Sequence, residues 1–271
     1  MRNDRRPFSF IGSGKMAEAM INGLLKKGIP PNEIFGSGPR KERGQELEGK
    51  YGIGTGTSNL EAIPARVITL SVKPQTMRSV LAEMKGKMDD ETIVVSIAAG
   101  VKLQTIADGL DTERVVRAMP NTPGRINRGV TIWTATKTVE SWERKAVQEL
   151  LGVLGTEIFV DEEKYLDMAT ALSGSGPAYI FLFMEALIDA GVRLGLPRYL
   201  AEQLIQETVA GSAEYAKASG AHLAELRNEV TSSAGTSAEA LYQLEKAGFR
   251  TGIAKAVQAA YLRSVELGKA K

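Results

Sequence analysis

The chain has 271 residues, of which 43% are hydrophobic and 24% charged, a composition typical of a folded globular protein of one large or two ordinary domains. Its formal net charge of +2 provides no strong field for nucleic acid or an anionic membrane, and we expect neither as a partner. The lack of cysteine excludes disulfides and thiolate metal sites, and a lone histidine, His222, argues against a histidine metal site or a Ser-His triad. We therefore expect no metal. We also expect no apolar run long enough to span a bilayer, no signal peptide and a cytoplasmic location.

Strands and helices alternate in the first half of the sequence. Short β-prone runs predict strands over residues 8–11, 33–36, 66–72, 92–97 and 114–119, with additional edge strands over 129–135 and 157–160. Helical spacing predicts helices over 15–27, 40–50 and 139–154. Strands that are apolar on both faces and alternate with helices indicate a doubly wound, mainly parallel sheet covered on both sides, an α/β fold.

The second half of the sequence has a different pattern of predicted elements. No convincing strand follows residue 162, and long helical patterns cover residues 179–194, 199–218, 237–248 and 252–268. We therefore predict two domains, an α/β domain over 1–161 and an all-α domain over 162–271. Several of these helices carry apolar residues on more than one face, which predicts packing against a second subunit.

A glycine turn lies between the first predicted strand and the first predicted helix. Gly12, Gly14 and Ala17 form the pattern G-x-G-x-x-A. Gly12 permits a tight turn, Gly14 lets a diphosphate approach the backbone, and Ala17 is small where helix and sheet pack closely. Because the pattern follows a strand, opens a helix and begins an alternating series, it predicts a dinucleotide-binding Rossmann domain rather than a merely structural turn.

The end of the second predicted strand indicates which dinucleotide would bind. An NAD site usually has Asp or Glu there, whereas this chain has Ser37, Arg40 and Lys41 in the stretch 36–41. A hydroxyl group and two cations suit a 2′-phosphate, so we favour NADP(H) over NAD(H). The alternative is an ordinary solvated start of a helix.

Three further loops follow predicted strands, at the edge where such sheets bind ligands: residues 71–74, 98–100 and 119–123. Lys73 is either a phosphate partner or catalytic acid, or an ordinary solvated lysine. Asn121 lies between two prolines, and its amide would either meet a nicotinamide or cap the turn.

Two stretches of the helical half are unusual. Residues 172–177 contain two glycines and a proline, which would kink or open the chain there or allow close helix packing. Residues 231–237, TSSAGTS, contain five hydroxyl side chains just before a predicted helix. Free N–H groups at a helix start together with Ser and Thr donors predict an anion or carboxylate site, the alternative being a plain N-cap.

With these stretches in place, the chain resembles the pyrroline-5-carboxylate reductases over nearly its whole length. The resemblance rests on the segments FIGSGKMAEAM, LSVKPQ, VVSIAAG, RAMPNTP, ALSGSGPAYIFLFMEALIDAGVRLGLPR, TSSAGTS and AGFRTGI. It implies reduction of L-1-pyrroline-5-carboxylate to L-proline by NADPH, with NADH possible, as the last step of proline biosynthesis. It also implies a homo-oligomer whose helical domains interlock as dimers and often form decamers, with the site between a nucleotide domain and the helical dimer.

The resemblance assigns roles residue by residue. It implies cofactor binding by Ile11, Gly12, Ser13, Gly14, Lys15, Met16, Ser37, Arg40, Asn59, Ser71, Val72, Lys73, Pro74, Ala98, Ala99, Gly100, Pro120 and Asn121. It implies substrate binding by Ser232, Ser233, Gly235, Thr236 and Ser237, with the Ser237 hydroxyl as the catalytic group near the ring nitrogen.

The TSSAGTS stretch departs from the usual S-P-G-G-[TA]-T of that family. Proline is replaced by Ser233, the first glycine by Ala234 and the final threonine by Ser237. The hydroxyl donor is retained, but alanine resists the positive φ that glycine accepts, so crowding at Ala234 would displace the turn.

Two other functions fit the motifs. A two-domain reductase of the β-hydroxyacid dehydrogenase type would need a catalytic lysine on an interdomain helix, for which Lys164 is the candidate. A non-catalytic NADP(H) sensor would bind the cofactor without turnover, although it would have no need of a second anion site.

Overall fold

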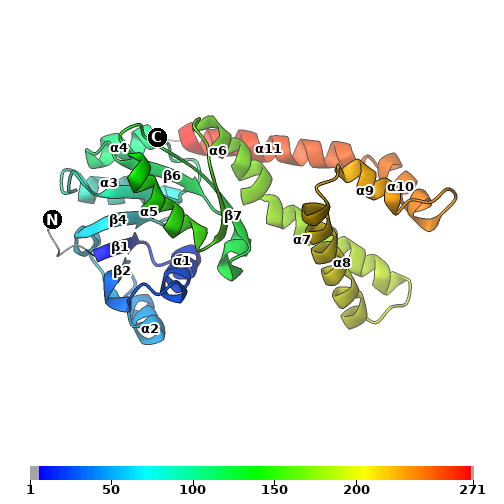
Figure 1. The fold of residues 1–271 in the computed structure, drawn as a ribbon, viewed down its shortest axis with the longest axis horizontal. Coiled ribbons are helices and arrows are strands. Elements are labelled where there is room, and N and C mark those ends of the chain that lie inside the picture. Colours follow the sequence, from blue (N-terminus) through cyan, green and yellow to red (C-terminus); the bar gives the residue numbers. More distant parts are fainter. Residues whose placement is uncertain (1–5, 270–271) are drawn as a thin grey trace. The chain divides into compact units, whose positions relative to one another are not determined.

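A computed structural model describes residues 6–269 of the chain. These residues form two compact units, one made of residues up to Ser175 together with residues from Ala260 onward, and one made of Gly176–Ala259 (Figure 1). We call them the nucleotide unit and the helical unit and describe each by itself. The predicted domain boundary after residue 161 stays a prediction.

The nucleotide unit is built on one eight-stranded sheet of order β3-β2-β1-β4-β5-β6-β7-β8. Its strands are β1 (Arg6–Ile11), β2 (Ile34–Ser37), β3 (Gly54–Gly56), β4 (Ala65–Leu70), β5 (Ile93–Ser96), β6 (Val115–Met119), β7 (Gly129–Ala135) and β8 (Gly155–Phe159). All neighbouring strands run parallel except the pair β6 and β7. The predicted doubly wound, mainly parallel sheet is therefore confirmed. Sequence reasoning missed β3, because Gly54-Thr55-Gly56 has no apolar residue.

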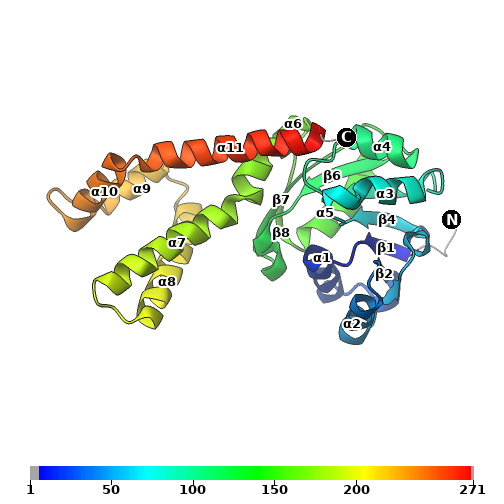
Figure 2. The same ribbon diagram turned by 180° about the vertical axis from the view of Figure 1, so that it is seen from behind.

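Helices cover both faces of this sheet, as the two opposite views show (Figures 1 and 2). They are α1 (Lys15–Lys26), α2 (Lys41–Tyr51), α3 (Pro74–Met84), α4 (Leu103–Leu110) and α5 (Ser141–Gly152). Short turns of 3-10 helix lie at η1 (Pro31–Glu33), η2 (Asn59–Ala62) and η3 (Thr122–Ile126). Helices α1, α2 and α5 share one buried cluster, whereas α3 and α4 contribute to the other.

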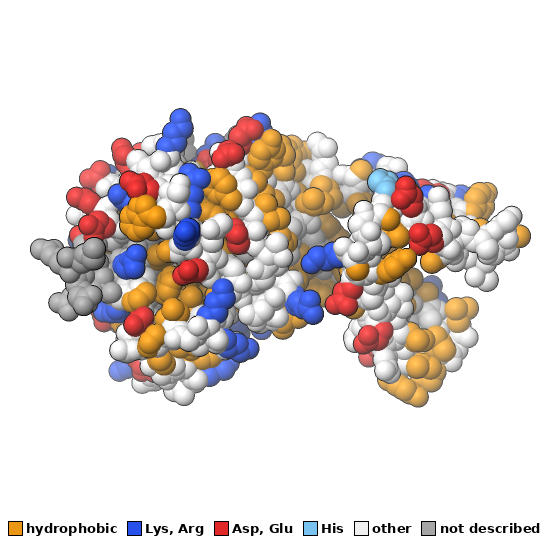
Figure 3. Space-filling model, in the orientation of Figure 1, with side chains coloured by type: hydrophobic (Ala, Val, Ile, Leu, Met, Phe, Trp, Pro, Cys, Tyr) orange, Lys and Arg blue, Asp and Glu red, His pale blue; other side chains and the backbone are white. Residues whose placement is uncertain are grey.

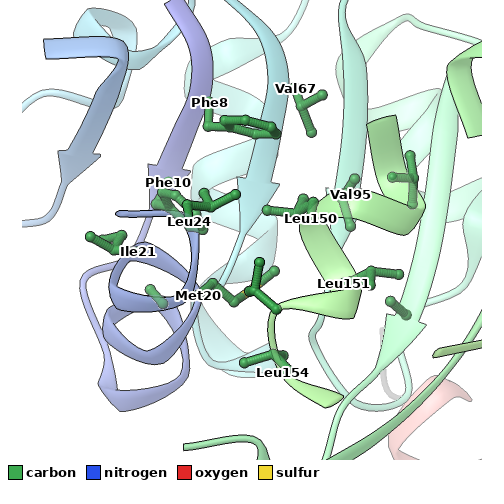
Figure 4. Packing of buried hydrophobic residues seen from close by; sticks show 14 of the residues in the cluster. Phe8, Phe10, Met20, Ile21, Leu24, Val67, Val95, Leu150, Leu151 and Leu154 are labelled. Carbon is green, nitrogen blue, oxygen red and sulfur yellow. The ribbon is translucent and has the colours of Figure 1, made fainter. Parts of the chain in front are cut away.

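The larger cluster fixes where the glycine turn lies. Phe8 and Phe10 of β1 pack with Met20 and Leu24 of α1 and with Leu150 of α5 (Figure 4). Burying each such side chain stabilises the fold by about 1.5–3 kcal/mol. Because both β1 and α1 are anchored in this core, the turn that joins them is held at the carboxyl edge of the sheet.

The nucleotide unit also contains α6 (Lys164–Ala169), the turn η4 (Thr170–Gly174) and the end of α11 (Phe249–Lys269). The buried guanidinium of Arg117 on β6 bonds to Glu163 at 3.0 Å and to Asp167 at 2.7 Å. Asp167 in turn accepts a hydrogen bond of 3.2 Å from Ser264. One buried cation therefore holds both α6 and the last helix against the sheet.

The glycine-rich stretch 172–177 forms a widened turn followed by a new helix. Residues Thr170–Gly174 are a π-helix, and the Ser175 N–H donates to the carbonyl of Thr170 at 2.8 Å. A Cβ on Gly174 would lie 2.7 Å from the Met119 Cε. The predicted opening of the backbone is therefore present, and Gly174 also closely approaches the end of the Met119 side chain.

The helical unit contains α7 (Gly176–Arg193), α8 (Arg198–Ser219), α9 (Leu223–Glu229), α10 (Thr236–Lys246) and the first part of α11. His222 is the N-cap of α9, and its Nδ1 accepts from the Ala224 N–H at 3.2 Å. Within Gly176–Ala259 only Ala201 is buried. Adjacent residues such as Phe181 and Leu182 are 61% and 67% exposed, so α7 is apolar on more than one face. Figure 3 shows hydrophobic side chains gathered where α7 and α8 lie.

The expectation that no apolar run is long enough to span a bilayer is wrong. The helical stretch Lys164–Arg193 has a mean hydropathy of 1.4 over an 18-residue window, so by length and composition alone it could cross a bilayer. Only 6% of that window is buried within the chain. An apolar helix surface that a second subunit covers has the same composition.

Candidate dinucleotide site and anion-binding turn

The turn after β1 has a geometry that only glycine allows. Gly12 has φ of +95°, and its N–H donates to the Ser37 carbonyl at 2.9 Å. A Cβ at this position would lie 2.9 Å from the carbonyl carbon of Ser71 and 2.9 Å from Val72 Cγ1. Gly12 is therefore required both for its backbone conformation and for the close approach of the neighbouring loop.

Helix α1 begins immediately after this turn with an open N-terminus. Gly14 is the N-cap, and in the described part of the chain no side chain caps it. A Cβ on Gly14 would have nothing within 4 Å, so the space in front of the helix is free. Ala17 is fully buried against the sheet, as its small size predicts. The first N–H groups of α1 therefore face open space, the arrangement that binds phosphate at helix N-termini.

The turn lies at the point where the strand order reverses. Strands β1 and β4 are neighbours, and from them the chain proceeds outward in opposite directions. The Ser71 N–H donates to the Ile11 carbonyl at 2.8 Å, and its hydroxyl donates to the carbonyls of Ile11 and Gly12 at 3.0 and 2.5 Å. Ser71 therefore braces the glycine turn at the crevice where such sheets bind nucleotides.

The other predicted cofactor loops lie at the same edge of the sheet. Lys73 is the exposed N-cap of α3, which begins at Pro74, and none of the described residues pairs with its side chain. The loop of Ala98, Ala99 and Gly100 follows β5, and Gly100 has φ of +77°. A Cβ on Gly100 would lie 3.1 Å from the backbone nitrogen of Gly268, so the end of α11 packs directly on this loop.

Ser37 and Asn59, predicted to contact the 2′-phosphate and the adenosine side, touch each other. The Ser37 hydroxyl is fully buried and donates at 3.0 Å to Asn59 Oδ1, with the Phe10 carbonyl at 3.4 Å. The Asn59 amide donates to Glu83 at 2.8 Å. Ser37 thus holds Asn59 in place, and its direct contact with a phosphate stays a prediction.

Arg40 differs from Ser37 in being available to a ligand. It is the exposed N-cap of α2, and its guanidinium forms neither an ion pair nor a hydrogen bond with the residues that the structure describes. The next residue, Lys41, is also exposed. These two cations follow the end of β2, where sequence reasoning expected a 2′-phosphate.

The amide of Asn121 has two partners within the nucleotide unit. Its Oδ1 accepts from the Val130 N–H at 2.9 Å, and its Nδ2 donates to the Ser173 carbonyl at 3.2 Å. Asn121 is the N-cap residue of η3, but its side chain makes no capping hydrogen bond, so the predicted cap is absent and the amide instead links the turn to β7 and η4. The contacts of Asn121 and of the buried Pro120 with a nicotinamide stay predictions.

Sequence reasoning missed an ionic network behind the glycine turn. The Glu18 carboxylate on α1 accepts hydrogen bonds from Arg43 at 2.5 Å, Lys50 at 2.9 Å and Tyr51 at 3.1 Å. Burial by itself would raise the pKa of Glu18, but the hydrogen bonds from Lys50 and Arg43 outweigh it and lower the pKa to about 2. No sequence pattern predicts this network, because its members lie on two helices separated by a strand.

The hydroxyl-rich stretch 231–237 forms a turn that leads into α10, as predicted. The Gly235 N–H donates to the Ser232 carbonyl at 3.1 Å, and Gly235 is the N-cap of α10. Ala234 has φ of +56°, the left-handed conformation that we expected alanine to resist. Among residues 6–269, none accepts the backbone N–H of Thr236 or Ser237.

The side chains of the turn are accessible. Ser232, Ser233 and Thr236 are exposed, and Ser237 is half-buried. With two free N–H groups, the positive end of the α10 dipole and several hydroxyls, the turn can bind a carboxylate. The assignment of these residues to the substrate stays a prediction.

Lys164, the candidate catalytic lysine of the alternative reductase, forms an ion pair with Glu162. The hydrogen bond to Glu162 raises the pKa of Lys164, which keeps the ammonium protonated at neutral pH and makes it a weaker acid. Within the described ranges no group of three or more potential metal ligands gathers.

A glycine turn at the switch point of a Rossmann sheet, joined to a helical unit with almost no core of its own, defines a two-domain nucleotide-dependent oxidoreductase. Two family models match the chain accordingly. Residues 7–100 match NADP oxidoreductase coenzyme F420-dependent, and residues 163–267 match pyrroline-5-carboxylate reductase dimerisation.

Whole-chain relatives narrow this class to one family. The chain is 39% identical over 263 residues to a pyrroline-5-carboxylate reductase of Pseudomonas aeruginosa, covering 96% of each chain. It is 41% identical to that of Synechocystis, covering 96% of this chain and 97% of the relative. The solved Coxiella burnetii enzyme has a TM-score of 0.89 at 36% identity, covering 98% of this chain and 99% of that one. A Plasmodium falciparum pyrroline carboxylate reductase with NADP bound has a TM-score of 0.88 at 33% identity, with the same coverage.

The chain belongs to the pyrroline-5-carboxylate reductase family. The resemblance, the fold class and the presence of a dimerisation domain that the sequence predicted are therefore confirmed.

Proposed function

We propose that this protein reduces L-1-pyrroline-5-carboxylate to L-proline with NADPH. The proposal rests on the glycine turn. Gly12, at φ of +95°, leads into the open N-terminus of α1 at the point where the strand order of the sheet reverses. Family membership supports the substrate, and the NADP-bound relative from Plasmodium falciparum supports the cofactor. Both the β-hydroxyacid dehydrogenase alternative and the sensor alternative are disfavoured by full-length similarity to reductases of this imine.

The residues of the nucleotide unit fit a dinucleotide diphosphate. Gly14 leaves free space where a Cβ would stand, and the first-turn N–H groups of α1 face that space. NADPH supplies a hydride from its nicotinamide ring when bound. Arg40 and Lys41, exposed at the end of β2, would pair with the 2′-phosphate and favour NADPH over NADH.

The turn at the start of α10 would hold the substrate by its carboxylate. The N–H groups of Thr236 and Ser237 and the hydroxyls of Ser232 and Ser233 are the proposed donors, and Gly235 keeps the turn tight. A Cβ on Gly235 would lie 2.4 Å from the Ser232 Oγ, so a larger residue would displace that hydroxyl.

Ser237 is the proposed catalytic residue. Its hydroxyl would hydrogen-bond the ring nitrogen or relay a proton to it through water while the hydride adds to C5 of the imine. A serine hydroxyl is a poor acid, so holding the ring in one orientation would supply most of the acceleration.

The proposed assembly is a homodimer formed through the helical unit. The exposed apolar side chains of α7 and the match to a dimerisation model support it. Assembly of dimers into a decamer is the larger state that the resemblance implies, and light scattering coupled to gel filtration would distinguish the two. We place the protein in the cytoplasm, without a nucleic-acid or membrane partner.

One assay tests the proposed reaction. NADPH absorbance is followed on addition of pyrroline-5-carboxylate, then with NADH in its place, and proline is quantified by mass spectrometry. We expect NADPH loss to match proline formation one to one, with slower NADH turnover. Loss of NADPH without proline, or no loss at all, would overturn the proposal.

A further inference from the structure

Arg43 lies in the mostly exposed helix α2, but its guanidinium is buried. Its Nε donates to the carbonyl of Ser13 at 3.0 Å, its Nη2 donates to Glu18 at 2.5 Å, and its Nη1 pairs with Glu46 at 2.6 Å. Only 9% of its side chain is exposed. Each of its three nitrogens therefore has a partner, and one of those partners is the backbone of the glycine turn.

The bond to Ser13 sets the direction of the following N–H group. A trans peptide group is planar, so its carbonyl and its N–H point in opposite directions. The structure contains no cis peptide among the described residues. Since Arg43 fixes the Ser13 carbonyl on one side, the Gly14 N–H of the same peptide group points to the other side. Among residues 6–269 no group accepts the Gly14 N–H, so this donor is available to a ligand.

The charge of Arg43 is already balanced. Glu18 and Glu46 both pair with it, and hydrogen bonds to these two carboxylates outweigh the effect of its burial and raise the pKa of Arg43. Arg40, three residues earlier, is exposed and has no side-chain partner among residues 6–269. At the start of α2, Arg40 is therefore available to pair with a ligand phosphate, whereas the charge of Arg43 is already paired within the protein.

We propose that Arg43 is a positioning residue that aims the Gly14 N–H at the cofactor diphosphate and does not contact the 2′-phosphate. This proposal rests on the proposed function, because it assumes that a dinucleotide binds at the glycine turn. Since NADPH and NADH share the diphosphate, loss of Arg43 should weaken both cofactors by the same factor.

The test compares Arg43→Gln and Arg43→Lys with the matched control Arg40→Gln. Direct binding of NADPH and of NADH is measured by calorimetry, together with thermal unfolding and with kcat at saturating NADPH. We expect both Arg43 variants to weaken both cofactors about tenfold, the effect of one lost hydrogen bond in this site, with kcat changed less than twofold. Arg40→Gln should weaken NADPH about tenfold and leave NADH unchanged.

The lysine variant separates positioning from mere stability. Lysine retains a cation beside Glu18 but cannot also bond the Ser13 carbonyl through a fixed fork, so it should recover most of the thermal stability and none of the affinity. It also keeps the test valid if Arg43→Gln does not fold.

The outcomes separate this inference from the proposed function. If the wild-type protein binds neither cofactor, the proposed function fails. If the wild type binds both and the Arg43 variants bind them equally well, with only lower thermal stability, the positioning role is wrong. Loss of NADPH affinity alone would also overturn it, because Arg43 would then contact the 2′-phosphate.

Discussion

The two units of this chain bury their apolar residues in different ways. The nucleotide unit encloses two clusters in which Phe10, Ile68 and many others are fully buried. The helical unit buries only Ala201 within Gly176–Ala259, while Phe181 and Leu182 stay mostly exposed. The nucleotide unit is therefore stabilised by its own core, whereas we infer that the helical unit is stabilised by packing against a partner subunit. Its stability should then depend on protein concentration.

The largest expected effect is on assembly. The double variant Phe181→Asp, Leu182→Asp would place unpaired charges in the proposed interface and should weaken dimer formation by several kcal/mol. We expect monomers at micromolar concentration by sedimentation velocity. Ile126→Asp is the control, since Ile126 is a similarly exposed apolar side chain (72%) in the nucleotide unit and should leave assembly unchanged. A double variant that assembles like the wild type would contradict the proposed interface.

The second effect concerns the buried cation of the nucleotide unit. Arg117→Ala removes the buried partner of Glu163 and Asp167, whose side chains are 29% and 17% exposed, and leaving these half-buried carboxylates unpaired should lower the free energy of unfolding by about 3 kcal/mol, the low end for a buried pair. Urea denaturation measures this change in the free energy of unfolding. The control is Arg198→Ala in the helical unit, which removes an exposed pair with Asp189 and should change the stability little, because solvent screens the pair. Equal losses in both variants would remove the distinction between the units.

The pKa of Glu18 predicts a pH dependence of stability. Its folded pKa of about 2 lies below the ordinary value of 4.5, so ionised Glu18 stabilises the fold fully above about pH 5 and progressively less as the pH falls toward 2. At pH 7 Glu18→Gln should be less stable by up to about 3 kcal/mol. The difference from wild type should narrow between pH 5 and pH 3 in urea titrations. A difference that stays constant over this range would show that ionisation of Glu18 is not its source.

Ser237→Ala tests the catalytic role proposed for the helical unit. Loss of the hydroxyl beside the ring nitrogen should lower kcat about tenfold, a barrier change of about 1.4 kcal/mol. Ser237→Thr keeps the hydroxyl and should retain most of the rate. Unchanged steady-state kinetics in the alanine variant would remove Ser237 from the mechanism.

The smallest effect is expected at Ala234, whose left-handed backbone is unfavourable for alanine by about 1–2 kcal/mol. Ala234→Gly relieves this strain but adds freedom to the unfolded chain, so the net gain in stability should be below about 1 kcal/mol. Ala238→Gly, inside α10, should instead lower stability by about 1 kcal/mol. Denaturation at fixed protein concentration compares them, and a loss in both variants would mean that Ala234 is not strained.

Sequence reasoning succeeded where the signal is local. Alternating apolar runs predicted most strands of the sheet, and the pattern at Gly12 predicted a turn whose positive φ the structure shows. It failed where local signal is absent, as at β3 with its two glycines and at the short helix α9. Contacts between residues far apart in the sequence could not be predicted either. Nothing in the sequence pairs Glu18 with Arg43, 25 residues away, or shows that the Ser37 hydroxyl turns inward to Asn59.

We propose that a hydride passes directly from NADPH to a cyclic imine held by its carboxylate. Incubating the intact protein and pyrroline-5-carboxylate with NADPH that carries deuterium at the transferred C4 position tests this transfer. We predict one deuterium at C5 of the proline product by NMR. Proline without deuterium, from either C4 epimer of the labelled cofactor, would contradict direct transfer.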